Sequence, residues 1–509
     1  MASTAIPEQI SLRVVVDKEQ NRVLYAEAGK DFVDILLSFL TLPLGTIARL
    51  VSRDSNTKPC RFGCISSLYE SVGNLDPKYL NSETCKQMLL QPRNSMERYN
   101  QNLKLNIDDT EPTKYYACID CLFQGPSLVT TFKNMKCKCG RNFTFLLNPC
   151  KWLLCSPLLS GSDKNASGDA GDNTWEGYVK ETASFIISDD LSVTPANFNT
   201  TLCLLKNLRS ECLPEESTVV LSSNEILDLL KYLLISKTAL TDSLLRKEHS
   251  LMYSDTSFKI TDERQDREST GTMKIKVLMS KSKSKILFAQ VEEDFMDQLL
   301  SFLTFPLGAV ERVLEGNSGA VCVDKLYNSL FNFDSTVDLT SENLKNMFAN
   351  LMIAPYFNVD NQMVPIDELK YPSELSVCSN EHAIGPYYLT ADASLYLRVV
   401  RRVRMCDPKP PIAEGKSSNG YAKSRTKFMV ADDLSVKPFS SHHVLSSLLT
   451  ELKVPHHDLE ERTIRIGVQE AVSILKASMV STSALTIGLK EFLSNNIKEE
   501  GETKTRSSG

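Results

Sequence analysis

The chain contains 509 residues, with 57 basic and 63 acidic side chains, so its formal net charge is −6 at neutral pH. Hydrophobic residues make up 42% and charged residues 24% of the sequence, which are ordinary values for globular proteins. These values exclude a wholly disordered chain, a collagen-like chain and a coiled coil. A chain of this length has material for roughly three domains.

No basic segment followed by an apolar segment opens the sequence, so we predict no secretory signal. The most apolar stretch, residues 32–45, contains Asp34 and is shorter than the roughly 20 residues that span a bilayer. We therefore expect a cytoplasmic or nuclear protein with no membrane contact. Because thiols stay reduced there, the 14 cysteines are expected to be buried residues, metal ligands or a nucleophile.

The sequence repeats itself. Residues 10–51 align without gaps with residues 273–314, and 17 of the 42 positions are identical. The centre of the match reads DF-x-D-x-LLSFLT-x-PLG in both segments. Two later pairs also match, the DDLSV blocks at 185–195 and 428–438 and the ALT-ending segments at 218–241 and 463–486. This order predicts a tandem duplication of a two-part unit, A1–B1–A2–B2.

Each A part is predicted to begin with a β-hairpin, because β-rich residues 12–16 and 22–27 flank a polar turn. A helix should follow, since five apolar residues recur at i, i+3, i+4, i+7 and i+8 from Phe32. We expect Asp31 to be its N-cap, as Asp294 would be in the second copy, and Pro43 to end it. Further helices are predicted at residues 63–72 and 82–90.

Each B part is predicted to open with a strand, an Asp-Asp turn and a second strand. A helix such as 441–452 follows, and then strand 463–466 leads to helix 469–480. The predicted fold class is therefore α+β: a tandem duplication of a two-part unit, each part a β-hairpin followed by helices, with a zinc-ribbon-like insertion in the first copy.

Composition places the boundaries of these parts in small, polar or charged segments. We predict nine segments: A1 at 10–115, a Cys-rich zinc-ribbon-like insertion at 116–156, a linker at 157–180, B1 at 181–247, a linker at 248–272, A2 at 273–405, a linker at 406–424, B2 at 425–494 and a disordered tail at 495–509.

The repeated DF-x-D-x-LLSFLT-x-PLG block, the DDLSV-x-P block and the ALT-ending helix together resemble one family, the plant-specific domain of unknown function 674. The resemblance covers residues 10–493 and recurs in both copies. It implies a plant protein that is a tandem two-copy member. It implies no activity, because the family has none assigned, so no catalytic residue is carried over.

Four cysteines predict a metal site. The spacing is C-x2-C-x15-C-x-C-G, from Cys118 and Cys121 to Cys137 and Cys139. Two thiolates on a tight turn can both reach one ion about 2.3 Å away, and two such turns complete a tetrahedron. The expected cofactor is a structural zinc ion, because four thiolates leave no open position for a substrate. Reduced thiols without metal, or a redox or catalytic role, are the alternatives.

The second copy lacks this cluster. Cys378 aligns with Cys118, but Glu381 stands where Cys121 would be, and no C-x-C follows. The metal is therefore not needed for the fold of every copy. Cys64 and Cys322 align with each other beside a shared Leu-Tyr pair, and we expect them to pack in the core, where free cysteine behaves as a small hydrophobe.

Paired carboxylates at Asp189-Asp190 and Asp432-Asp433 recur in both copies. Such pairs can do acid–base chemistry. Adjacent residues of a strand point to opposite faces, however, so an Asx turn between two strands is the better interpretation. The common phosphate-binding, dinucleotide-binding, serine-hydrolase and zinc-protease motifs are missing from the sequence.

Two basic segments interrupt this acidic chain, and phosphate binding requires such clusters. Residues 122–161 contain no acidic side chain, and residues 398–427 carry nine basic and two acidic ones. Aromatic residues in the first segment could stack on bases. The candidate nucleic-acid-binding residues are Lys133, Lys136, Lys138, Arg141, Arg398, Arg401, Arg402 and Arg404.

These observations favour a non-catalytic interaction or scaffold protein with a structural zinc site and a protein partner. A nucleic-acid-binding protein that uses the zinc ribbon and the basic segments is the first alternative. An enzyme with an unrecognised carboxylate or thiol site is the second.

Overall fold

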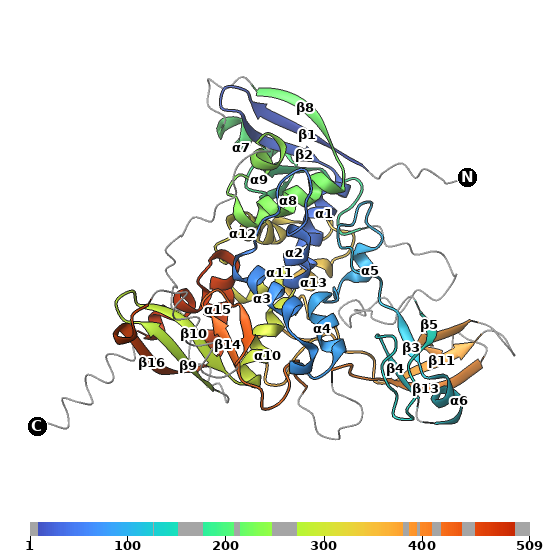
Figure 1. Ribbon diagram of the computed structural model, residues 1–509. Coiled ribbons are helices and arrows are strands. Elements are labelled where there is room, and N and C mark those ends of the chain that lie inside the picture. The colour runs from blue at the N-terminus through green and yellow to red at the C-terminus, as the bar shows by residue number, and fades with distance from the viewer. Residues whose placement is uncertain are drawn as a thin grey trace, which may run out of the picture.

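The computed structural model describes residues 9–125, 127–150, 177–207, 214–246, 272–379, 386–393, 398–409, 419–439 and 454–493. Three sheets lie at the corners of a triangle, and the helices fill its centre (Figure 1). We call residues 9–246 the first half and residues 272–493 the second half. The mixed architecture confirms the α+β class.

Each half forms one five-stranded antiparallel sheet. The first sheet has the order β7-β6-β2-β1-β8 and the second the order β15-β14-β10-β9-β16. The predicted parts A1 and B1 therefore share one sheet, and A2 and B2 share the other. The strands are β1 (Ile10–Asp17), β2 (Arg22–Ala28), β6 (Phe185–Ser188), β7 (Val193–Pro195), β8 (Pro214–Leu221), β9 (Met273–Ser280), β10 (Lys285–Val291), β14 (Phe428–Ala431), β15 (Val436–Pro438) and β16 (Leu459–Ile466).

The third sheet is a closed barrel with strands from both halves, in the order β11-β12-β5-β3-β4-β13. Within each half the strands pair antiparallel, whereas the two seams between halves, β12 with β5 and β13 with β4, are parallel. Closure leaves no free sheet edge. The strands are β3 (Tyr115–Ala117), β4 (Leu128–Thr130), β5 (Phe145–Pro149), β11 (Leu375–Ser379), β12 (Tyr387–Thr390) and β13 (Arg398–Met405).

Most of the helices bury an apolar face between these sheets, whereas the side chains of α7 that the structure describes are largely exposed. In the first half they are α1 (Lys30–Thr41), α2 (Leu44–Val51), α3 (Gly63–Asn74), η1 (Pro77–Tyr79), α4 (Glu83–Leu90), α5 (Glu97–Asn100), α6 (Ile119–Gln124), α7 (Phe198–Asn207), α8 (Ser223–Ile235) and α9 (Ala239–Leu244). In the second half they are α10 (Glu293–Ser301), η3 (Phe302–Thr304), α11 (Leu307–Val313), α12 (Val321–Ser329), η4 (Leu330–Asn332), α13 (Leu344–Ala349), η6 (His456–Asp458) and α15 (Val468–Val480).

The structure confirms the helix predicted from Phe32 and corrects its first residues. Gly29, not Asp31, is the N-cap of α1, and Glu292, not Asp294, is the N-cap of α10. The Asp31 carboxylate lies in the first turn, where its negative charge interacts favourably with the helix dipole. It accepts a hydrogen bond from Lys104 Nζ at 2.7 Å. The predicted helix 441–452, residues 157–176 of the predicted linker 157–180, residues 248–271 of the predicted linker 248–272 and the tail at 495–509 lie outside the described residues.

The repeated Pro-Leu-Gly segments of the two halves meet at the centre of the molecule. Pro43 and Pro306 form an antiparallel bridge. Leu44 N donates to Phe305 O, and Leu307 N donates to Leu42 O, both at 3.0 Å. The two hydrogen bonds are equivalent, because their residues are related by the 263-residue offset of the sequence match. The contact between the halves is therefore reciprocal.

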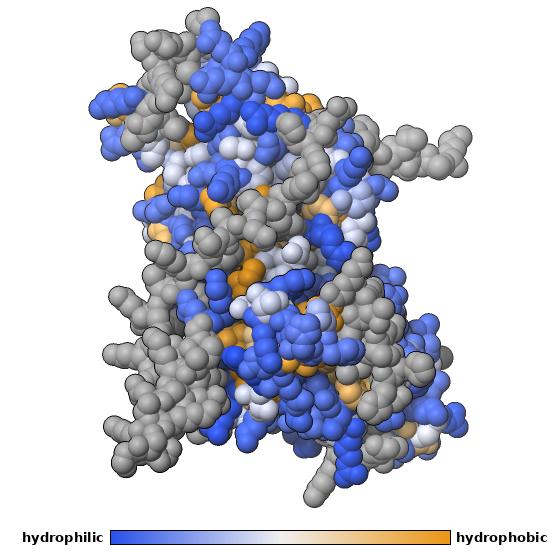
Figure 2. Space-filling view, turned by 60° about the vertical axis from the view of Figure 1, so that its left-hand side comes forward, coloured by the Kyte–Doolittle hydropathy of each residue, from blue (hydrophilic) through white to orange (hydrophobic). Residues whose placement is uncertain are grey.

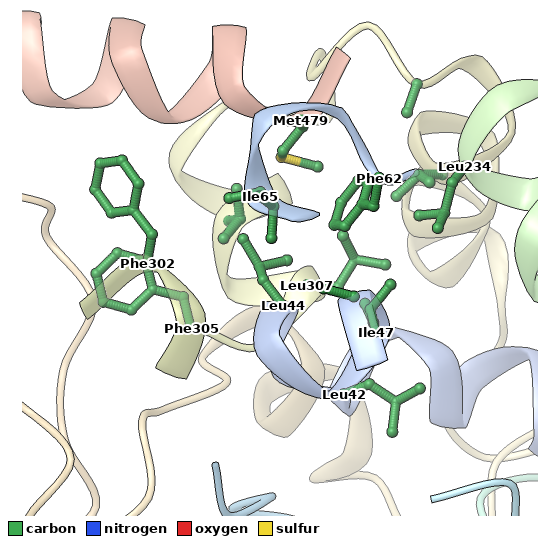
Figure 3. Close-up of a cluster of buried hydrophobic side chains, with 14 of the residues drawn as sticks. Leu42, Leu44, Ile47, Phe62, Ile65, Leu234, Phe302, Phe305, Leu307 and Met479 are labelled. Carbon is green, nitrogen blue, oxygen red and sulfur yellow. The ribbon is translucent and has the colours of Figure 1, made fainter. Parts of the chain in front are cut away.

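Side chains around this bridge form a core that belongs to neither half alone (Figure 3). Leu44 and Ile65 of the first half lie beside Leu307 and Met479 of the second, and all four are fully buried. Burying one such side chain stabilises a fold by roughly 1.5 to 3 kcal/mol. The hydrophobic energy of this region therefore depends on both halves being in place.

One helix of each half packs on the other half. Helix α3 contacts α15 and β15, and α12 contacts α8 and β7. Ser71 Oγ accepts a hydrogen bond from Val436 N, and Ser329 Oγ accepts one from Val193 N, both at 2.9 Å. These contacts are again equivalent, because each serine lies seven residues after the aligned cysteine of its helix. The two halves thus exchange a helix.

In each half, a buried carboxylate binds the backbone of a segment that contacts the other half. Asp34 Oδ1 accepts the backbone N–H groups of Tyr178 and Val179 at 2.8 and 2.9 Å. Asp297 Oδ1 accepts those of Tyr421 and Ala422 at 2.8 and 2.7 Å. Val179 in turn bridges Leu339 of the second half, and Ala422 bridges Leu80 of the first. The second Asp of the repeated motif therefore orients a segment that reaches across to the other half.

We predict that Gly45→Ala destabilises the protein by about 1 to 3 kcal/mol, because overpacking a well-filled contact has that cost. A Cβ at Gly45 would lie 2.9 Å from the backbone oxygen of Leu303, in the other half. The matched control is Gly73→Ala in α3, where a Cβ meets no atom within 4 Å and the change should be neutral or slightly stabilising. Thermal denaturation measures both variants, and equal melting temperatures for the two would contradict the prediction.

A second prediction concerns pH. Burial raises the pKa of Asp297 to about 7 and that of Asp34 to about 6, above the value of about 3.9 in an unfolded chain. The folded state then holds more protons than the unfolded state, so stability should fall as pH rises from about 4 to 7. Asp297→Asn should reduce that fall by on the order of 2 to 4 kcal/mol, because the amide stays neutral and its oxygen can accept the same bonds. Parallel stability curves for the variant and wild type between pH 4 and 8 would show the idea to be wrong.

Candidate metal centre

Two short elements position the first pair of cysteines. Strand β3 ends at Ala117, and Cys118 then serves as the N-cap residue of α6, which contains Cys121 in its first turn. Leu122 N donates to Cys118 O at 2.9 Å, which closes that turn. Because residues three positions apart lie on one face of a helix, both thiols point to the same side.

The second pair lies in a tight turn that folds back on the barrel. Cys137 N donates to Arg141 O at 2.6 Å, and Gly140 N donates to Cys137 O at 2.9 Å. Gly140 has φ +88°, a backbone conformation that favours glycine, and this explains the glycine after the C-x-C pair. We call residues 134–143 the knuckle.

The four thiols come together. Their sulfur atoms all lie within 4.8 Å of one another. The Sγ atoms of Cys118 and Cys139 are 3.5 Å apart, and those of Cys121 and Cys137 are 3.6 Å apart. Four thiolates at about 2.3 Å from a zinc ion would be separated by about 3.8 Å along the edges of a tetrahedron. The arrangement therefore has the size of a tetrathiolate site.

The surroundings of the thiols are apolar on one side and open on the other. Cys118, Cys121 and Cys137 are buried with the fully buried Phe143, while Cys139 is exposed. Burial and the neighbouring thiols raise the pKa of Cys121. The N–H of Arg141 and the nearby thiols hold the pKa of Cys139 at about 7. A bound cation would provide the charge that four adjacent thiolates need.

Among the described residues, this is the only group of three or more Cys, His, Asp or Glu side chains that could hold a metal ion. In the second half, Cys378 lies buried in β11, and Glu381 lies outside the described residues. Cys64 and Cys322 are buried and donate to the backbone oxygens of Ser481 and Ser236 at 3.0 and 3.1 Å. The core role expected for these two thiols is confirmed, and each contact crosses between the halves.

The Asp-Asp pairs are structural. Asp190 Oδ1 accepts from Ser192 N at 3.2 Å, as an Asx turn requires. Asp189 points the opposite way and accepts from the backbone N–H of Thr241 at 2.8 Å. Asp432 contacts Thr486 in the same way at 2.8 Å. The turn interpretation is confirmed, and the repeated ALT motif proves to be the partner of the first aspartate.

The structure brings the two basic segments onto one barrel. Lys133, Lys136, Lys138 and Arg141 are exposed on and beside the knuckle, which follows β4. The other four candidates, Arg398, Arg401, Arg402 and Arg404, lie in β13, which pairs directly with β4. Arg401 is partly buried and donates to Gly125 O at 2.6 Å, and Arg141 forms an ion pair with Asp120.

Sequence reasoning missed this proximity, because the register of β13 on β4 joins residues more than 270 positions apart. It also missed the Gly-Tyr pairs at 177–178 and 420–421, in which the backbone N–H of the tyrosine donates to a buried aspartate. Their spacing of 243 residues, the same as that of the DDLSV blocks, is the signal that could have revealed them.

No helix among the described residues is long and apolar enough to cross a membrane. No curated protein and no solved structure matches the chain. One family model matches residues 7–469, which is most of the sequence, under the description protein of unknown function, DUF674. On this match, the chain belongs to the DUF674 family.

Proposed function

We propose that the protein is a non-catalytic binding scaffold of the cytoplasm or nucleus that carries one structural zinc ion. The observation that supports it most is the geometry of the four cysteines, which matches a closed tetrathiolate site. Such a site fixes local structure and leaves no position for a substrate. The ion would join the start of α6 to the knuckle and so hold the knuckle on the barrel.

We also propose that the chain arose by tandem duplication, as expected for a two-copy plant member of the family, and that its copies associate like the subunits of a symmetric dimer. The reciprocal bonds at Pro43 and Pro306 and the exchanged helices α3 and α12 support this. The residues that the copies share are occupied with internal contacts: Asp34 and Asp189 bind backbone N–H groups, and so do their counterparts. The features found in one copy only, the cysteine cluster and the basic strand, are then the places to look for function.

The enzyme alternative has less support. A cleft of about 700 Å³ lies between α3 and β15. Arg61 and Glu70 line it and form an ion pair with each other at 3.0 Å, and Asp433 is engaged in its own turn with Ser435 N at 3.0 Å. These side chains already have structural partners. A face that is mainly hydrophilic, with scattered apolar patches, also fits a protein that binds through local surfaces (Figure 2).

The metal proposal predicts one zinc ion per chain in the full-length protein, measured by native mass spectrometry. Cys137→Ser should abolish stoichiometric binding, because three thiolates remain at a site built for four. The same variant should lower the melting temperature, since metal binding free energy is part of the folding free energy of such sites.

Cys150→Ser is the matched control, because Cys150 is a half-buried thiol of the same barrel that lies outside the cluster. It should keep its zinc. A metal-free wild-type protein, with the four cluster thiols alkylated as fast as Cys150, would refute the metal site.

A further inference from the structure

We propose that the outer face of the barrel binds single-stranded nucleic acid. The surface consists of Arg402 and Arg404 on β13, Lys136 and Lys138 on the knuckle, and Phe123 on α6. We call it the basic face. The proposal names a partner class for the proposed scaffold and rests on it for the knuckle lysines, whereas the β13 arginines are held by the barrel itself.

The strand geometry points the arginines outward. Val403 is buried in the barrel core, so Arg402 and Arg404 on either side of it face solvent. Arg404 pairs with Leu128 of β4, and Leu128 packs against the cysteine cluster on the outside of the barrel. The knuckle therefore lies next to the exposed side chains of Arg402 and Arg404 on β13.

The lysines of the knuckle complete the basic face. Lys136 and Lys138 are exposed and flank Cys137. Cys406, the residue after β13, donates its backbone N–H to Val129 O of β4 at 2.8 Å. Burial raises the pKa of the Cys406 thiol, and Lys138 is close enough for its charge to oppose that rise. Two cations from each segment therefore share one surface, although they are more than 260 positions apart in the sequence.

Within the part of the chain that the structure describes, none of these four cations forms an ion pair within 4.0 Å. Elsewhere, exposed cations such as Arg13 and Lys18 are paired with carboxylates. A cluster of exposed, unpaired cations is complementary to a row of phosphates.

An aromatic side chain at the rim favours nucleic acid over other polyanions. Phe123 is 48% exposed, and its ring meets the edge of Tyr387 at a centroid distance of 6.2 Å. Phe145 supports Tyr387 at 5.5 Å. Arg401 binds the backbone at the end of the same helix, which ties α6 to β13. Phe123 is thus a supported, half-exposed ring on a helix that is joined to the basic strand, and unstacked bases bind on such rings.

Fluorescence anisotropy with a labelled 15-nucleotide oligouridine tests the proposal on the full chain. At about 50 mM salt we expect a dissociation constant on the order of 1 to 100 μM, with a logarithmic salt slope of about −2.8 for four phosphate contacts. The double variant Arg402→Glu, Arg404→Glu should bind at least 10-fold more weakly and reduce the magnitude of the slope by about 1.4. Phe123→Ala should weaken binding about 5-fold or more without changing the slope.

The matched control is the double variant Lys274→Glu, Arg465→Glu. These residues are an exposed cross-strand pair on β9 and β16, away from the barrel, and their replacement changes the net charge equally. It should bind within 2-fold of wild type. Equal losses in both double variants would overturn the proposal, since binding would then follow net charge alone. No binding at 100 μM protein would also overturn it, and so would tighter binding to polyglutamate or to phosphatidylserine vesicles than to the oligonucleotide.

Metal removal separates this proposal from the zinc site. With a chelator, the slope should lose only the contribution of the two knuckle lysines, about 1.4, and the arginine contribution should remain. A protein that contains no zinc, yet loses binding in the arginine variant, would refute the metal and support the basic face. A zinc-bound protein with no affinity for the oligonucleotide would support the metal site and refute the basic face.

Discussion

The reciprocal contact at Pro43 and Pro306 is the constraint on which the rest of the structure depends. The two backbone segments approach closely here, and each has a glycine two residues after its proline. A Cβ at Gly45 would lie 2.9 Å from Leu303 O and a Cβ at Gly308 would lie 3.1 Å from Leu40 O, both in the other half. The contact fixes α2 against η3 and α1 against α11. Once these helices are placed, α3 and α12 are directed onto the opposite sheets, and the two sets of barrel strands are brought together.

This arrangement explains which residues the two halves have in common. Each contact across the interface occurs twice, because the aligned residue of the other half makes the equivalent contact. The same residue type is therefore needed at both aligned positions. Cys64 and Cys322, Ser71 and Ser329 are of this kind. The barrel is different, because the side chains that its two sets of strands present are not the same. One half supplies the cysteines and the other supplies the β13 arginines, so the basic face that we propose is complete only in the assembled barrel.

Much of the local structure could be predicted from the sequence. Period-3.6 spacing located α1, and β-rich segments located β1 and β2, because these patterns depend on near neighbours. The proximity of the four cysteines was also predictable, since they come from one short segment whose spacing is typical of metal ligands. The cap at Asp31 was wrong, because the helix begins two residues earlier than predicted and Gly29 takes the cap position.

Long-range pairings could not be predicted. Nothing local tells Asp34 from a surface carboxylate, although it lies in an apolar helix and is buried against a segment 144 residues away. The same holds for the register of β13 on β4, which unites the two basic segments. These features depend on how the two halves associate, and a single sequence shows that only through the repetition of its motifs.

The most direct test of this account is to cut the chain between its halves. A protease site placed within residues 255–265, outside the described residues, would separate the two halves covalently after folding of the intact chain. We predict that the cut protein elutes from a size-exclusion column as one particle of about 57 kDa, because the exchanged helices and the shared barrel hold it together. Immediate separation into two folded fragments under native conditions would contradict the account.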